Sequence, residues 1–173
     1  MFRLRQRRVT NPLRDSAVAW DVQGLAAEVR VFQPIGSVDD ADPAIFAKVQ
    51  RCFADALGLD LGDVAFDKSV LGDLGAESLD LLDIAFRLER AFDIRIPRGG
   101  IEQAGREGLA AGESYEVGGV LTQGARDKLA LAMPEVPPTE FREGLKVSEV
   151  ATLLRVGTFY NISAGLMAQK AAG

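Results

Sequence analysis

The sequence contains no histidine and only one cysteine, Cys52. Without histidine, the chain lacks the usual general base of serine and cysteine hydrolases and the commonest zinc ligand. A single cysteine cannot form a disulfide within the chain, which fits a reducing compartment. We therefore expect a cytoplasmic protein with no metal site. The sequence also offers no convincing acid–base pair, so we do not expect the chain to be an enzyme on its own.

Long apolar runs are also missing. None approaches the ~18 residues that a membrane-spanning helix requires, and no signal peptide is evident. Hydrophobic residues nevertheless make up 47% of the 173 residues. That content supports a real core in one domain with extensions, and it argues against wholesale disorder.

Charge is unevenly distributed along the chain. Residues 1–30 carry six arginines and three acids, whereas residues 39–93 carry thirteen acids and five bases. From residue 94 onward, acids and bases are balanced at nine each. The acidic middle of the chain suits basic protein partners and is poorly suited to nucleic acid.

The first predicted helix follows an N-terminal extension. Residues 1–42 form this extension, and its basic start fits a disordered arm, an upstream translation start or a targeting peptide. Asp42 as N-cap and Pro43 at the first helical position then predict a helix that Gly58 ends.

A second helix is predicted from Ser78, as its capping residue, to about Phe92. An Asp- and Gly-rich loop, residues 59–77, leads into it, and Pro97 follows it. Beyond this point, residues 99–121 are predicted as a flexible loop because glycines are frequent and periodicity is weak. Further helices are expected over residues 122–133, 147–154 and 158–169. No strand pair is predicted.

The predicted helix after Ser78 carries two apolar stripes. The first stripe is expected to face the core and consists of Leu81, Ile84, Ala85, Leu88 and Phe92. The second consists of Leu79, Leu82 and Phe86, and it is flanked by Glu77, Asp80 and Asp83. An exposed second stripe would be a docking surface for a basic, hydrophobic partner, whereas a covered one would be additional core.

Ser78 has two interpretations. A serine at a helix start is commonly a plain N-cap, worth about 1 kcal/mol. Its hydroxyl has no activating base, because histidine is absent and no basic residue occurs between Lys68 and Arg87. Ser78 is therefore better suited to accept a group from an enzyme that brings its own base than to act as a catalyst.

These features together resemble the acyl carrier protein family. The resemblance covers residues 43–97, with the motifs Leu74-Gly75-Ala76-Glu77-Ser78-Leu79 and Phe92-Asp93-Ile94-Arg95-Ile96-Pro97, and resumes more loosely over residues 145–167. It implies an all-α, acyl-carrier-like four-helix bundle over residues 43–173. An inserted loop plus helix would occupy about residues 98–144, in addition to the N-terminal extension.

The resemblance also implies a function. Ser78 would receive a covalent 4′-phosphopantetheine arm from coenzyme A through a phosphopantetheinyl transferase, which makes the chain a phosphoprotein. Acyl groups would then travel on the arm as thioesters in fatty acid biosynthesis or another branch of lipid metabolism, held in part by the core between the helices. Acyl-loading, synthase or acyltransferase enzymes with basic docking surfaces would bind Glu77, Leu79, Asp80, Leu82, Asp83 and Phe86.

The sequence departs from the family pattern in three places. Glu77 stands where the family usually has Asp, and Arg87 and Arg90 lie on a helix that is often acidic in the family. The insertion at about residues 98–144 could shield a long chain, form a partner site or only decorate the surface. These departures favour dedicated partner enzymes. The alternatives are a non-acylated adaptor that binds proteins through the acidic helix, and an aminoacyl or aryl carrier.

Overall fold

The computed structural model describes residues 32–173, so the expectations for residues 1–31 lie outside the described part. The α-helices are α1 (Pro43–Leu57), α2 (Ser78–Phe92), α3 (Gly100–Arg106), α4 (Gln123–Ala132) and α5 (Val156–Ala172). Short 3₁₀ helices are η1 (Val38–Asp40), η2 (Leu61–Asp63), η3 (Pro138–Glu140) and η4 (Val147–Leu153), and one hairpin pairs β1 (Glu116–Val117) with β2 (Val120–Leu121). The predicted all-α class is confirmed. Within the described residues, no helix has both the length and the apolar character needed to cross a bilayer.

Helix α1 begins and ends where the sequence predicts. The Asp42 carboxylate accepts hydrogen bonds from the backbone N–H groups of Ala44 and Ile45, at 2.8 and 3.1 Å. Pro43 occupies the first turn, where its missing N–H costs nothing. Gly58 ends the helix in the left-handed conformation, with φ at 67°.

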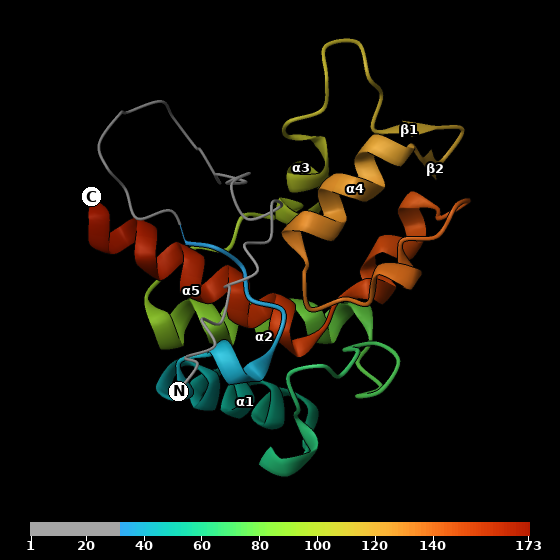
Figure 1. Cartoon of the computed structure of the whole chain (residues 1–173). Helices are drawn as coiled ribbons and strands as arrows, with labels where there is room; N and C mark the ends of the chain where they lie inside the picture. The colour runs from blue at the N-terminus through green and yellow to red at the C-terminus, as the bar shows by residue number, and fades with distance from the viewer. Residues whose placement is uncertain (1–31) are drawn as a thin grey trace, which may run out of the picture.

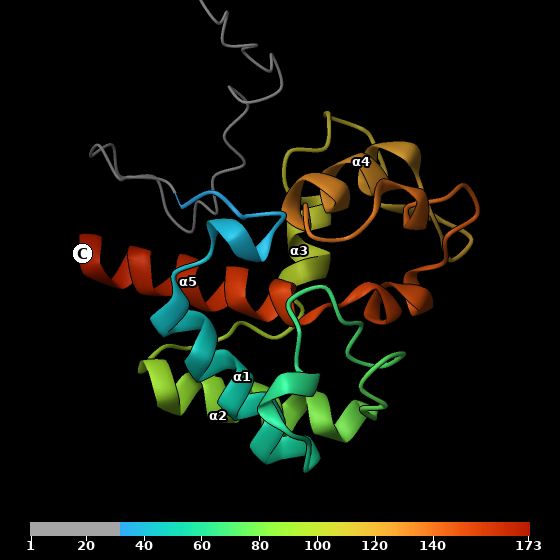
Figure 2. The ribbon, with the colours of Figure 1, turned by 60° about the horizontal axis from the view of Figure 1, so that its bottom comes forward.

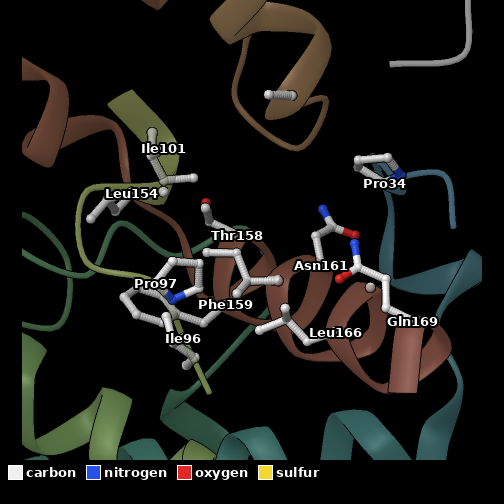
Figure 3. A pocket seen from close by; sticks show the side chains of 14 residues that line it. Pro34, Ile96, Pro97, Ile101, Leu154, Thr158, Phe159, Asn161, Leu166 and Gln169 are labelled. Atoms are coloured by element: carbon white, nitrogen blue, oxygen red, sulfur yellow. The ribbon is translucent and has the colours of Figure 1, made fainter. Parts of the chain in front are cut away.

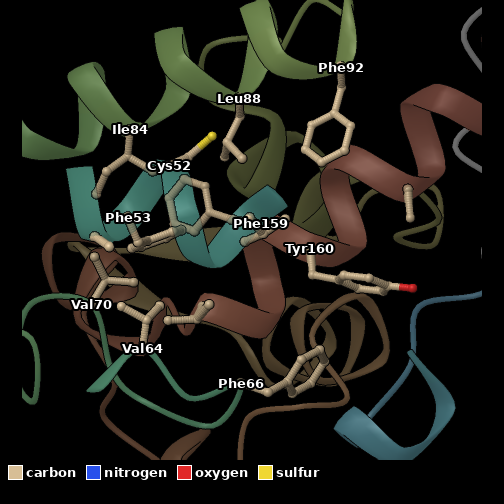
Figure 4. Packing of buried hydrophobic residues seen from close by; sticks show 14 of the residues in the cluster. Cys52, Phe53, Val64, Phe66, Val70, Ile84, Leu88, Phe92, Phe159 and Tyr160 are labelled. Carbon is tan, nitrogen blue, oxygen red and sulfur yellow. The ribbon is translucent and has the colours of Figure 1, made fainter. Parts of the chain in front are cut away.

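Two hydrophobic cores lie on opposite sides of α5. Figures 1 and 2 show α1 and α2 on one side of this helix and α3 and α4 on the other. Ile84 and Leu88 of α2 point toward Phe53 of α1 in the first core, and all three are fully buried (Figure 4). The rings of Phe53 and Phe159 meet edge to face, with 5.3 Å between their centroids. The second core gathers α3, α4, the hairpin and η4 around Leu129, Met133 and Leu145.

The prediction of a flexible loop without strands over residues 99–121 is wrong. The segment contains α3 and a complete hairpin whose register pairs Val117 with Val120. Gly118 and Gly119 form its two-residue turn with φ values of 60° and 82°. Tight hairpin turns of this kind require positive φ at both central positions. The glycines therefore specify a turn rather than flexibility.

The last helix is longer than predicted. The Thr158 hydroxyl accepts a hydrogen bond from the Arg155 backbone N–H at 3.0 Å, so the helix starts two residues earlier, at Val156. At the other end, the Lys170 ammonium donates to the backbone oxygen of Asp93 at 2.8 Å. The predicted short helix before α5 is present as η4, with 3₁₀ geometry.

Gly157 has no room for a side chain. A Cβ at this position would lie 2.5 Å from Cε1 of Phe66, whose ring is held between Phe46 and Tyr160. We expect Gly157→Ala to lower the free energy of unfolding by about 2–3 kcal/mol, because overpacking a filled core forces side chains and backbone to shift. Urea unfolding measures the change. Gly62→Ala is the matched control, since nothing lies within 4 Å of its added Cβ. An unchanged Gly157→Ala midpoint would contradict this packing.

Candidate functional site

Ser78 is exposed at the start of α2 but does not cap it, which corrects the prediction made from the sequence. Glu77 is the N-cap, in an extended conformation, and its N–H donates to the Asp80 carboxylate at 2.7 Å. Ser78 is the first helical residue, so it lies outside the cap position, and the residue is exposed. The first N–H groups of a helix have no intrahelical acceptor. The serine therefore stands beside unsatisfied donors and the positive end of the helix dipole.

The loop before Ser78 is held by its own hydrogen bonds. The Ser69 N–H donates to the Asp73 carboxylate at 2.8 Å, and the Gly72 N–H donates to the Ser69 hydroxyl at 3.1 Å. Gly75 turns the chain with φ at 68°, and the buried Ala76 donates to the carbonyl of Val70 at 3.1 Å. These bonds place the serine on a defined turn.

Arg155 connects this loop to the segment between α2 and η4. Its guanidinium pairs with Glu140 at the end of η3, and it lies 3.8 Å from the Asp73 carboxylate. The Arg155 side chain is only 12% exposed, whereas the side chains of Asp73 and Glu140 are 47% and 34% exposed. Sequence reasoning missed this role, since no local pattern brings Asp73, Glu140 and Arg155 together.

The two faces of α2 differ in burial. Ile84 and Leu88 are 0% exposed, whereas Leu79, Leu82 and Phe86 are 76%, 47% and 52% exposed. We call these three residues the apolar α2 face. The described segments of the chain leave it uncovered, including the whole segment between α2 and η4.

The three acids next to this face have different surroundings. Asp80 accepts the N–H of Glu77 at the cap. Asp83 forms an ion pair with Arg87, 2.8 Å away and one helical turn along, and this hydrogen bond raises the pKa of Arg87. Glu77 is exposed directly beside Ser78. The structure thus brings the predicted residues Glu77, Ser78, Leu79, Asp80, Leu82, Asp83 and Phe86 onto one end and one face of α2, with Asp83 partly neutralised.

Comparison with known proteins points to one family. Residues 47–102 match the family model described as the phosphopantetheine attachment site. The chain is similar to the acyl carrier protein of Clostridium acetobutylicum, with 42% identity over 53 residues, which are 31% of this chain and 69% of that protein. It is also 42% identical over 59 residues to the acyl carrier protein of Guillardia theta, covering 34% of this chain and 73% of that protein. No solved structure matches the chain.

Proposed function

Since this chain belongs to the acyl carrier protein family, we propose that it carries acyl intermediates as thioesters on a 4′-phosphopantetheine arm attached to Ser78. The phosphopantetheine attachment site that the chain contains spans residues 47–102 and includes this serine. The observation that carries the assignment is the exposed Ser78 hydroxyl, free of the helix cap, at the end of a hydrogen-bonded loop. Leu79, which follows it, is the most exposed large apolar residue of α2.

The residues around Ser78 fit this group. When bound, the arm supplies a terminal thiol on which acyl groups form thioesters. Attachment would form a phosphoester bond at Ser78 Oγ as the phosphoanhydride bond of coenzyme A breaks, and adenosine 3′,5′-bisphosphate would leave. The hydroxyl proton must leave to a base of the transferase, since the chain has no histidine to take it. The N–H groups at the start of α2 would stabilise the negative charge of the phosphodiester.

We assign partner docking to the apolar α2 face and its acids. Leu79, Leu82 and Phe86 supply the apolar contact, and Glu77 and Asp80 supply negative charge for a basic enzyme surface. Arg87 pairs with Asp83 and Arg90 adds a further positive charge, so this α2 differs from the mostly acidic helix that the resemblance implies. We infer dedicated partner enzymes in a lipid or specialised biosynthetic pathway.

We also assign residues 43–173 to one carrier domain in which residues 98–144 are an insertion. The assignment is supported by position, because this segment lies between α2 and η4 and contributes α3, α4 and the hairpin to the second core. The second core reaches the carrier helices through Val150 and Leu153 of η4. The proposed insertion therefore packs against the carrier helices.

Enzymatic labelling tests the proposed function. The full chain is incubated with coenzyme A and a broad-specificity phosphopantetheinyl transferase, and intact mass is recorded. We expect a single added phosphopantetheine, and fragmentation should place it on the peptide that contains Ser78. No mass gain would favour the non-acylated adaptor and overturn the proposal. A gain mapped to another residue would overturn the assignment of Ser78.

A further inference from the structure

A pocket lies between α5 and the layer formed by α3 and α4 (Figure 3). Its volume is about 200 Å³. The walls come from distant parts of the chain: the α2–α3 connection, the end of α4, one face of α5 and the segment at Pro34. Most of the surface is hydrocarbon, from Ile96, Pro97, Ile101, Phe159, Ile162 and Leu166.

The pocket lies between the two cores. Leu166 and Ile96 pack against the first core, and Ile101 packs against the second. Ile162, on α5 between these walls, is a partly buried side chain that belongs to neither core. Among the described residues, Phe159 is the only buried residue of the first core that lines the pocket. The lining does not include Phe53, Ile84 or Leu88, which are fully buried between α1 and α2 (Figure 4).

The polar side chains on the pocket wall are already paired. The Asn161 amide nitrogen donates to the Glu135 carboxylate at 2.9 Å and to the carbonyl of Ile35 at 3.0 Å, and its oxygen accepts the Ile35 N–H at 2.9 Å. The Thr158 hydroxyl donates to Glu135 and accepts from the N–H of Arg155. An occupant therefore meets hydrocarbon rather than free hydrogen-bonding groups.

The same hydrogen bonds join three walls of the pocket. Glu135 comes from the segment after α4, Asn161 from α5, and Ile35 from the chain before α1. Burial raises the pKa of Glu135, while the bonds from Thr158 and Asn161 partly offset that effect. Two side chains of the pocket wall, Thr158 and Asn161, are therefore fixed by hydrogen bonds to one buried carboxyl group.

The volume sets the size of a suitable ligand. A dry apolar cavity of ~150 Å³ accepts benzene, which has six carbons. By proportion, a volume of 200 Å³ has room for about eight carbons of a saturated chain.

Backbone hydrogen bonds of the loop before α2 connect one end of the pocket to the neighbourhood of Ser78. Leu154 lines the pocket, and its carbonyl accepts the Val70 N–H at 2.9 Å. The Val70 carbonyl in turn accepts the N–H of Ala76, two residues before Ser78. Each of these two hydrogen bonds spans about 5 Å between backbones, and the two residues from Ala76 to Ser78 add at most about 7 Å. Ser78 therefore lies within roughly 17 Å of Leu154.

We propose that this pocket holds the hydrocarbon tail of the acyl group carried on the Ser78 arm. The occupant is a saturated chain of medium length that enters from the Leu154 end. The inference rests on the proposed function, and it moves the tail from the interior between the helices, where the resemblance places it, to a cavity that the insertion helps to build.

Photo-crosslinking tests the location of the tail. The transferase loads Ser78 with an octanoyl-pantetheine analogue bearing a diazirine at its last carbon, intact mass confirms loading, and irradiated protein is mapped by peptide mass spectrometry. We expect crosslinks on Ile101, Ile162 and Leu166. Crosslinks on Phe53 or Leu88 would overturn the inference, and so would a loaded protein without internal crosslinks. Failure to load would instead refute the proposed function, and the inference would fall with it.

Variants of Ile162 sharpen the test. Ile162→Trp fills the cavity and Ile162→Asn makes its floor polar, and both should load normally yet lose at least about nine-tenths of the crosslinks at Ile101. Leu131→Trp is the matched control, because Leu131 is exposed on α4 and does not line the pocket. Unchanged crosslinking at Ile101 in both Ile162 variants would overturn the inference.

Discussion

Replacing Ser78 with alanine is expected to abolish the transferase-dependent mass gain completely while leaving stability almost unchanged. The reaction needs the hydroxyl oxygen, and alanine has none. Stability is spared because Glu77, not Ser78, caps α2. We therefore expect the free energy of unfolding to change by less than about 0.5 kcal/mol, as for an ordinary surface substitution, rather than by the ~1 kcal/mol of a lost N-cap. Intact mass and urea unfolding measure the two effects.

Ser148→Ala is the matched control for Ser78→Ala. Ser148 is also exposed near the start of a helix, η4, but it lies outside residues 47–102, which match the attachment site. We expect this variant to take up one phosphopantetheine at the wild-type rate. A mass gain that survives Ser78→Ala would mean that another residue is the acceptor. A loss of more than about 1 kcal/mol in Ser78→Ala would show that its hydroxyl has a capping role.

Local signals in the sequence predicted the helices that present the site. Asp42, Pro43 and Gly58 gave the limits of α1, and the first apolar stripe gave the inward side of α2. The cap of α2 was misplaced by one residue. Serine is a preferred N-cap, but here the Asp80 carboxylate reaches back to the N–H of Glu77, and that geometry is not visible in a propensity.

The second core and the pocket depend on contacts between distant residues, so the sequence could not reveal them. The second core forms because Leu129 of α4 and Met133, directly after this helix, pack in one cluster with Leu145. Asn161 on α5 binds Glu135 and Ile35, which are 26 and 126 residues away along the chain. No periodicity or spacing encodes such pairs. Glycine frequency was also misleading, since it is high both in flexible loops and in a hairpin turn such as that at Gly118 and Gly119.

The exposure of the apolar α2 face favours the docking hypothesis over the alternative that this face is additional core. The sequence left open whether the extra segments cover Leu79, Leu82 and Phe86. In the described residues, α3 and α4 pack on the far side of α5 instead (Figures 1 and 2), and the three side chains remain exposed. Exposed apolar residues clustered beside Ser78 and its acidic neighbours fit the proposed docking surface for an enzyme that must reach this serine.

Leu82→Arg and Phe86→Glu are each expected to slow transferase labelling of Ser78 by about 30- to 150-fold, the effect of removing a contact worth ~2–3 kcal/mol at the centre of an interface. Leu82→Arg also places a positive charge against a basic partner, so its defect should shrink as salt rises. Initial labelling rates at subsaturating protein measure the effect. Both residues are about half exposed, so unfolding midpoints should stay near wild type. Leu131→Arg, at 44% exposure on α4, makes the same change away from the face and should label normally. Normal labelling of both α2 variants would show that the transferase recognises the loop before Ser78 rather than the apolar α2 face.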